Sequence, residues 1–215
     1  MLKSSSLRTL LALALGLVAG LSPAADQPTA VQLQRADKIV AALALPDTAQ
    51  AARVRDLIAR QYADLAAIHD PRDAAIRAAK ANPDKTAANA AIAEAKAAAE
   101  PKIAALHADF LSRLATELTP AQIDQVKDGL TYGVLPLTFR VYQEMLPQMT
   151  AEQKAQILAW LTEAREHAMD GSTSDEKHAW FGKYKGRINN YLSKAGIDMK
   201  QAEKDMMERK KSATP

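Results

Sequence analysis

Five short segments of this chain carry the signature of a helix start, and they constrain the fold more than any other feature. In each segment, an Asp or Thr that can cap a helix is followed three residues later by Gln or Glu. The cap oxygen accepts a hydrogen bond from a free N–H of the first turn, and the Gln or Glu bonds back to the N–H of the cap. The pairs are Asp47/Gln50, Thr119/Gln122, Thr150/Gln153, Thr173/Glu176 and Asp198/Gln201. They predict a chain of helices joined by capped turns.

The rest of the composition agrees with an all-α fold. No stretch alternates apolar and polar residues over the length of a strand, and glycine is scarce, at 8 of 215 residues. Both observations argue against an all-β or a parallel α/β chain. The chain has no cysteine, which excludes disulfides, thiolate metal sites and thiol nucleophiles. We expect an all-α protein in which a long antiparallel helical hairpin is followed by a compact helical bundle.

The first 25 residues have the layout of a secretory signal peptide. Lys3 and Arg8 precede an apolar run over 10–21, and small residues follow at 22–25. The run is shorter than the ~20 residues that a membrane-spanning helix needs, although an uncleaved anchor is the alternative. We expect a periplasmic or secreted protein with no transmembrane segment after cleavage. Without Lys3 and Arg8 the net charge falls from +3 to +1, so no nucleic-acid partner is expected.

Residues 26–118 are expected to form a short helix over 31–43 and then a long helical hairpin with its turn at 82–84. Core-facing positions recur at helical spacing on both sides of that turn. They are Val54, Ile58, Gln61, Leu65 and Ile68 before it, and Ile92, Ala95, Ala99, Ile103, Leu106 and Phe110 after it. Pro71 and Pro101 fall inside the two arms, and each is expected to bend or break its helix.

Residues 119–215 are expected to form an aromatic-rich helical bundle that holds the best site candidate. Eight of the ten aromatic residues lie beyond position 130, and ten basic residues face four acidic ones over 177–211. Aromatic faces beside Arg and amide donors suit sugars and carboxylates. The candidate ligand-binding residues are Tyr132, Arg165, His167, Lys177, Trp180, Lys183, Tyr184, Arg187 and Asn190. The alternative is that the aromatic residues are core and the charges are a solvated face.

Sequence motifs for catalysis are absent. There is no G-x-S-x-G, H-E-x-x-H, phosphate-binding glycine loop or dinucleotide fingerprint, so no cofactor is expected. His167, Asp170 and His178 are a weaker alternative as a divalent metal site, if the connection between their helices is tight. His69 and His107 are expected to be solvated and about 15 Å apart along the hairpin, too far to share a metal.

Two five-residue segments resemble the LTxxQ motif of small periplasmic chaperones of the Spy and CpxP type. They are Leu118–Gln122 and Met149–Gln153, the second with Met in place of Leu. The resemblance implies a helical hairpin protein that cradles unfolded clients. The same letters are what two ordinary capping boxes require.

A longer resemblance covers most of the chain after the signal peptide. It is carried by the strings at 127–134, 160–170 and 177–191, which are similar to a secreted bacterial family catalogued as domain of unknown function 3826. The resemblance implies an exported helical protein and a link to polysaccharide utilisation, because members are often encoded near polysaccharide-degrading systems. It implies no reaction and no catalytic residues.

These observations leave two classes of function open. The first is an exported non-enzymatic binding or chaperone-like protein, with an anionic polysaccharide or an unfolded or envelope protein as its partner. The alternative is a glycan-active enzyme that uses carboxylates such as Glu163, Glu166 and Asp170, which would have to lie about 5–10 Å apart in a cleft. A purely structural envelope protein is a third possibility.

Overall fold

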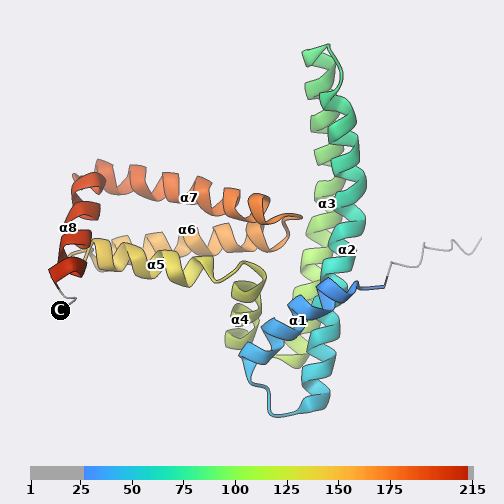
Figure 1. The fold of residues 1–215 in the computed structure, drawn as a ribbon, viewed down its shortest axis with the longest axis horizontal. Coiled ribbons are helices and arrows are strands. Elements are labelled where there is room, and N and C mark those ends of the chain that lie inside the picture. The colour runs from blue at the N-terminus through green and yellow to red at the C-terminus, as the bar shows by residue number, and fades with distance from the viewer. Residues whose placement is uncertain (1–26, 213–215) are drawn as a thin grey trace, which may run out of the picture.

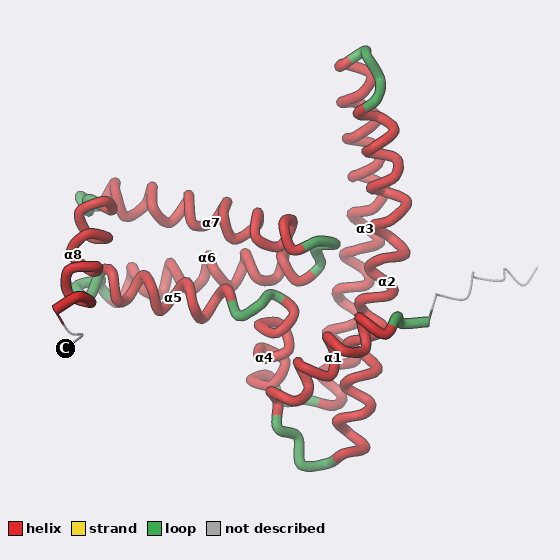
Figure 2. Tube along the Cα trace, viewed as in Figure 1, coloured by secondary structure: helices red, strands yellow, loops and turns green. Residues whose placement is uncertain are grey.

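The computed structural model describes residues 27–212, and these residues form eight helices and no strand (Figure 2). The predicted signal peptide therefore lies outside the described residues. The helices are α1 (Ala30–Leu43), α2 (Thr48–Lys80), α3 (Lys85–Glu117), α4 (Pro120–Leu130), α5 (Val134–Met145), α6 (Ala151–Met169), α7 (Ser174–Lys194) and α8 (Met199–Ser212). The prediction of an all-α fold is confirmed. Within the described residues, no helix has the length and apolar character to cross a membrane.

The predicted caps begin their helices, but not all of them form the full reciprocal pair. Thr119 and Thr150 make complete capping boxes at the starts of α4 and α6. The two LTxxQ-like segments thus serve as helix starts. Asp47, Thr173 and Asp198 also accept hydrogen bonds from the first turns of their helices. Their expected partners bond elsewhere: Gln50 to the carbonyl of Glu117, Glu176 to Ser172, and Gln201 to Asp205.

Helices α2 and α3 form the predicted hairpin, and each runs for 33 residues. They lie side by side along the upright part of the molecule (Figure 1). Asp84, the last residue of the turn at 82–84, caps the start of α3. Pro71 and Pro101 lie inside α2 and α3 without interrupting them, so of the predicted bend or break, the break does not occur at either proline. A single lost backbone bond is tolerated because each helix packs along its length against the other.

The connection between α4 and α5 is short. It comprises residues 131–133, and both Tyr132 and Gly133 have a positive φ, of 59° and 65°. Pro136 lies in the first turn of α5. Its missing N–H costs nothing there, because the first N–H groups of a helix have no partner within the helix.

Two hydrophobic cores hold the fold together. The first joins the hairpin to α1 and α4 and includes Ile58, Leu114 and Val126, all at 0% exposure. The second joins α5, α6 and α7 around Phe181 and Ile188. Helix α4 therefore contributes its apolar residues to the core of the hairpin and α1, and it also contacts α5 and α6. Figure 1 shows α5, α6 and α7 projecting from the side of the hairpin, with α8 across their far end.

Candidate functional site

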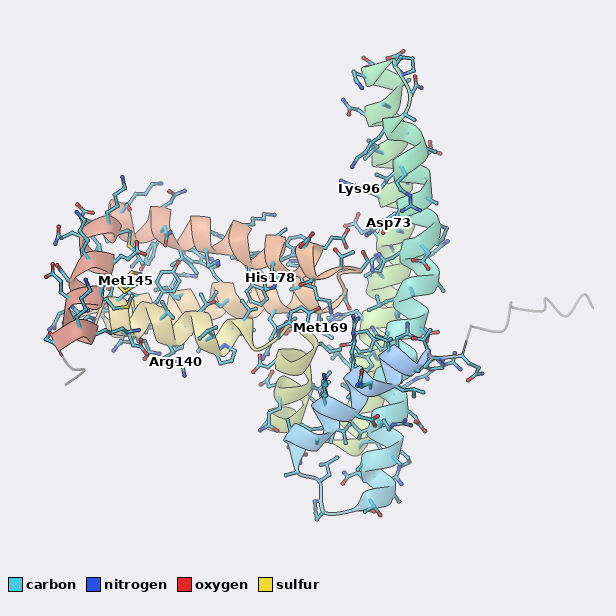
Figure 3. All side chains as sticks on the ribbon, in the orientation of Figure 1. Asp73, Lys96, Arg140, Met145, Met169 and His178 are labelled. Atoms are coloured by element: carbon cyan, nitrogen blue, oxygen red, sulfur yellow. The ribbon has the colours of Figure 1, made fainter. Side chains whose placement is uncertain are left out.

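A cleft of about 820 Å³ opens where the turn between α6 and α7 meets the side of the hairpin. Figure 3 shows Lys96 on the hairpin arm and Met169 at the end of α6 near this meeting point. The hairpin wall of the cleft consists of His69, Arg72, Ile76, Lys96, Ala99, Glu100, Ile103, Ala104 and His107. The opposite wall consists of Glu166, His167, Asp170, Gly171, Glu176, Ala179, Trp180 and Lys183. The cleft has the size of a small-molecule site.

Two histidines from opposite arms of the hairpin bond to the same residue of the opposite wall. His69 is buried, at 2% exposure, and its Nε2 donates to the backbone carbonyl of Asp170 at 2.7 Å. Because a carbonyl only accepts, the other ring nitrogen of neutral His69 is an acceptor, and this Nδ1 is buried without a partner. The Nδ1 of His107 donates to Asp170 Oδ2, also at 2.7 Å. The expectation that His69 and His107 are solvated is therefore wrong.

His107 lies between two carboxylates. Its Nε2 is 3.8 Å from Glu166 Oε2, while Asp170 binds the other side of the ring. The hydrogen bond with Asp170 raises the pKa of His107, although burial of the ring acts in the opposite direction. Lys127 of α4 binds the same Glu166 oxygen at 2.7 Å. This group of side chains links α3, α4 and α6, and it places an imidazole with a raised pKa at the cleft.

An aromatic platform forms the wall of the cleft on α6 and α7. The ring of His167 stacks on Trp180, with ring centroids 4.4 Å apart and planes 16° apart. The ammonium of Lys183 lies over the same indole, 4.9 Å from its centroid. Trp180 is half-buried and His167 is exposed. The stacked rings of His167 and Trp180 and the ammonium of Lys183 therefore line this wall of the cleft together.

Charged side chains surround this platform, and several neutralise one another. Arg72 binds Asp73 at 2.7 Å and Glu176 at 2.8 Å, which ties α2 to the start of α7. The pKa of Glu176 is lowered because hydrogen bonds from Ser172 outweigh the burial that opposes them. Lys96 and Glu100 stand exposed on α3 at the rim.

Of the predicted ligand-binding residues, His167, Trp180 and Lys183 line the cleft. Arg165 does not line it. Its side chain is 6% exposed and binds Asp128 at 2.9 Å and also Asp124, so that it fastens α6 to α4. A guanidinium enclosed by its own carboxylates is a structural link between helices.

The other predicted ligand-binding residues do not line the cleft, and they lie in separate parts of the structure. Tyr184 is buried in the second core, and burial raises its pKa to about 12. Arg187 lies over Trp160, 4.6 Å from the ring centroid, and Asn190 is exposed further along α7. Tyr132 and Lys177 belong to a separate group of rings and cations, described below.

The three residues of the alternative metal site are not brought together. His167 stacks on Trp180, Asp170 binds His107, and His178 stacks on Tyr132 at 5.8 Å. Within residues 27–212, no three His, Asp or Glu side chains are placed so that they could hold a metal ion. The described residues therefore hold no site that suits a transition metal.

Sequence reasoning did not identify His69, Arg72, Lys96 or His107 as site residues. All four lie on the hairpin, far in sequence from the platform on α6 and α7. No local pattern marks them, because they meet the platform only through the docking of the α6–α7 turn against the hairpin. In the structure, the bonds to Asp170 identify His69 and His107. Their place in the cleft wall identifies Arg72 and Lys96.

The fold defines an all-helical protein in which a helical hairpin and a projecting helix pair enclose a cleft. The family model of a protein of unknown function, DUF3826, matches residues 29–212. The chain belongs to this family, which confirms the resemblance seen in the sequence. No curated protein matches the chain.

Proposed function

We propose that this chain is an exported, non-enzymatic binding protein whose cleft takes an acidic saccharide. The observation that carries the proposal is the platform of Trp180 and His167, with the Lys183 ammonium over the indole, facing a cleft of about 820 Å³. A sugar ring places its apolar face on an aromatic side chain, and its carboxylate binds a neighbouring cation. Export is part of the proposal because of the signal-like residues 1–25.

The charge arrangement supports an acidic rather than a basic ligand. Of the four acidic side chains in the cleft, Glu166 binds Lys127, Asp170 binds His107 and Glu176 binds Arg72, which leaves Glu100 at the rim. Lys96 on one wall and Lys183 on the other are then the cations that a carboxylate meets. A polysaccharide made of uronate units supplies both the ring and the carboxylate.

The test is a thermal-shift and titration series on the purified protein with acidic and neutral oligosaccharides, for example trigalacturonate and its neutral counterpart. A ligand at a hundred times its Kd adds about 2.7 kcal/mol to stability. Trp180→Ala and Lys183→Gln are expected to weaken binding of the acidic ligand about three- to tenfold. Lys194→Gln is the matched control, because this exposed lysine lies on the same helix outside the cleft. Equal binding by all three variants would contradict the proposal.

A glycan-active enzyme is the second candidate, and His107 is the reason to keep it. His107 lines the cleft between Asp170 and Glu166, and its raised pKa favours the protonated ring that a general acid needs. Glu163, the third carboxylate considered, lies instead beside Arg187. Release of new reducing ends from an acidic polysaccharide, lost in His107→Gln, would support the enzyme. Binding without release would support the binding protein.

The chaperone-like alternative has less support. The large hydrophobic residues that are exposed within the described part of the chain are Val31, Tyr132, Leu137, Leu158 and Met207. They come from five different segments, whereas client binding needs a contiguous patch. Suppression of client aggregation at substoichiometric protein, with no saccharide binding, would favour the chaperone instead.

A further inference from the structure

Tyr132 is held in a backbone conformation that its side chain disfavours. Its φ of 59° lies in the left-handed region, which glycine and asparagine adopt far more readily than an aromatic residue. The backbone around it is fixed by the buried Thr131, whose hydroxyl donates to the carbonyl of Lys127 at 2.8 Å, and by the N–H of Gly133, which bonds to the carbonyl of Asp128. Strain of this kind concentrates at functional sites.

Burial does not explain why a tyrosine occupies this position. Tyr132 is 54% exposed, the second most exposed large hydrophobic residue of the described chain after Val31. Its ring stacks on His178, which is also exposed, with centroids 5.8 Å apart and planes 20° apart. The strained backbone thus presents a broad pair of rings to solvent.

One ammonium lies beside this pair of rings, and it is buried. Lys177 is 4% exposed, and its ammonium is 6.0 Å from the centroid of Tyr132 and 5.7 Å from that of Tyr62. It donates to the carbonyls of Leu130 and Met169, at 2.8 and 3.4 Å, rather than to a carboxylate. The exposed guanidinium of Arg35 on α1 lies over Tyr62, 5.8 Å from the centroid of that ring.

This group is separate from the cleft. Trp180 follows His178 by two residues, and at 100° per residue the two side chains leave α7 about 160° apart. None of Arg35, Tyr132 and His178 lines the cleft. Figure 3 places His178 below α7 in the view, at the level of α6.

We propose that Tyr132 and His178 form a second binding platform, for a sugar ring that carries a carboxylate. The exposed rings accept the apolar face of the sugar, and the exposed guanidinium of Arg35, next to Tyr62, attracts its carboxylate. The buried Lys177 adds positive charge without touching the ligand. The platform stands on its own contacts. If the cleft also binds an acidic saccharide, as proposed above, one polymer chain gains two points of attachment, and its retention exceeds that of a short fragment.

Tyr132→Asn separates a binding role from a structural one, because asparagine tolerates a positive φ. Retention of the purified protein on immobilised polygalacturonate is expected to fall about three- to tenfold, while the Tm stays equal or rises. Met207→Gln, which alters another exposed hydrophobic residue, is the matched control and is expected to change neither. Unchanged retention of Tyr132→Asn would overturn the proposal, whatever the Tm.

A second variant covers the case in which Tyr132→Asn lowers both the Tm and retention. His178→Ala removes the exposed partner ring and leaves the backbone at 131–133 intact. A similar fall in retention without loss of Tm supports the platform, and unchanged retention overturns it. Trp180→Ala measured beside it distinguishes the two sites. If only Trp180→Ala weakens retention, the platform fails and the cleft stands. If only the platform variants weaken retention, the cleft fails and the platform stands.

Discussion

The bond between His107 and Asp170 is the clearest place to test how the hairpin is fastened to α6. A hydrogen bond with a charged partner contributes about 1.5–3 kcal/mol. The side chains of His107 and Asp170 are 24% and 13% exposed, so solvent screening lowers the expected value to about 1–2 kcal/mol. We expect His107→Gln to lower the free energy of unfolding by that amount and the Tm by about 2–8 °C. Urea and thermal unfolding measure both.

The effect must also depend on pH with a definite sign. Pairing with Asp170 raises the pKa of His107 in the folded state, so the stabilisation is complete below the unfolded pKa of about 6.5 and is lost as pH rises through the folded value. The difference between wild type and His107→Gln is expected to shrink from about pH 6 to about pH 8. Burial lowers the pKa of Lys177 to about 8, so the folded state is stabilised as Lys177 loses its proton above that pH. The comparison therefore stops at about pH 8.

A double-mutant cycle gives the outcome that would refute this reasoning. Asp170→Asn keeps an acceptor oxygen but removes the charge beside His107. If the pair is coupled, the effects of His107→Gln and Asp170→Asn are not additive, and the interaction energy is about 1 kcal/mol or more at about pH 6. Additivity within ~0.3 kcal/mol, together with an equal effect of His107→Gln at both pH values, would show that the bond contributes nothing.

Three further predictions concern packing, and each is measured by urea unfolding. A Cβ at Gly129 would lie 2.8 Å from Ile39 Cγ1 and 3.4 Å from its Cβ, so Gly129→Ala must push α1 from α4 and is expected to cost about 1–3 kcal/mol. Gly182→Ala meets no atom within 4 Å on an exposed helix face and is expected to stabilise by about 0.5–1 kcal/mol; a loss of stability would show that this face is covered. Phe181→Ala opens a cavity in the second core, where Phe181 is 1% exposed, and is expected to cost about 3–5 kcal/mol. A cost below about 1 kcal/mol would mean that this core is loosely packed.

The positions of the helices could be predicted from the sequence because their signals are local. A cap at Thr119 or Thr150 acts within three residues, and Gly196, with a φ of 86°, ends α7 through bonds to residues just before it. The turn at 82–84 follows from the same kind of signal. The prolines show the limit of this reasoning, since Pro71 and Pro101 are tolerated by packing along the whole hairpin.

The predicted ligand-binding residues lie in different parts of the structure. Helical periodicity predicts which residues share a face of a helix, but not which other helix covers that face. Lys177 and Trp180 lie one turn apart in sequence, yet Lys177 is buried against Tyr62 and Trp180 opens into the cleft. Arg165 similarly looked available to a ligand and is enclosed by carboxylates of α4. In each case the deciding partner lies 30 or more residues away in the chain.

The sequence alone determined that this protein is a series of helices and where most of them begin, because caps, turns and helical periodicity depend on neighbouring residues. It also determined the family, through the match over residues 29–212. The tertiary structure decided which charges became structural links and which face a cleft. His69 and His107 meet Asp170 across 101 and 63 residues. That meeting depends on how the α6–α7 turn docks against the hairpin, a balance of packing and desolvation over two cores that no short segment encodes.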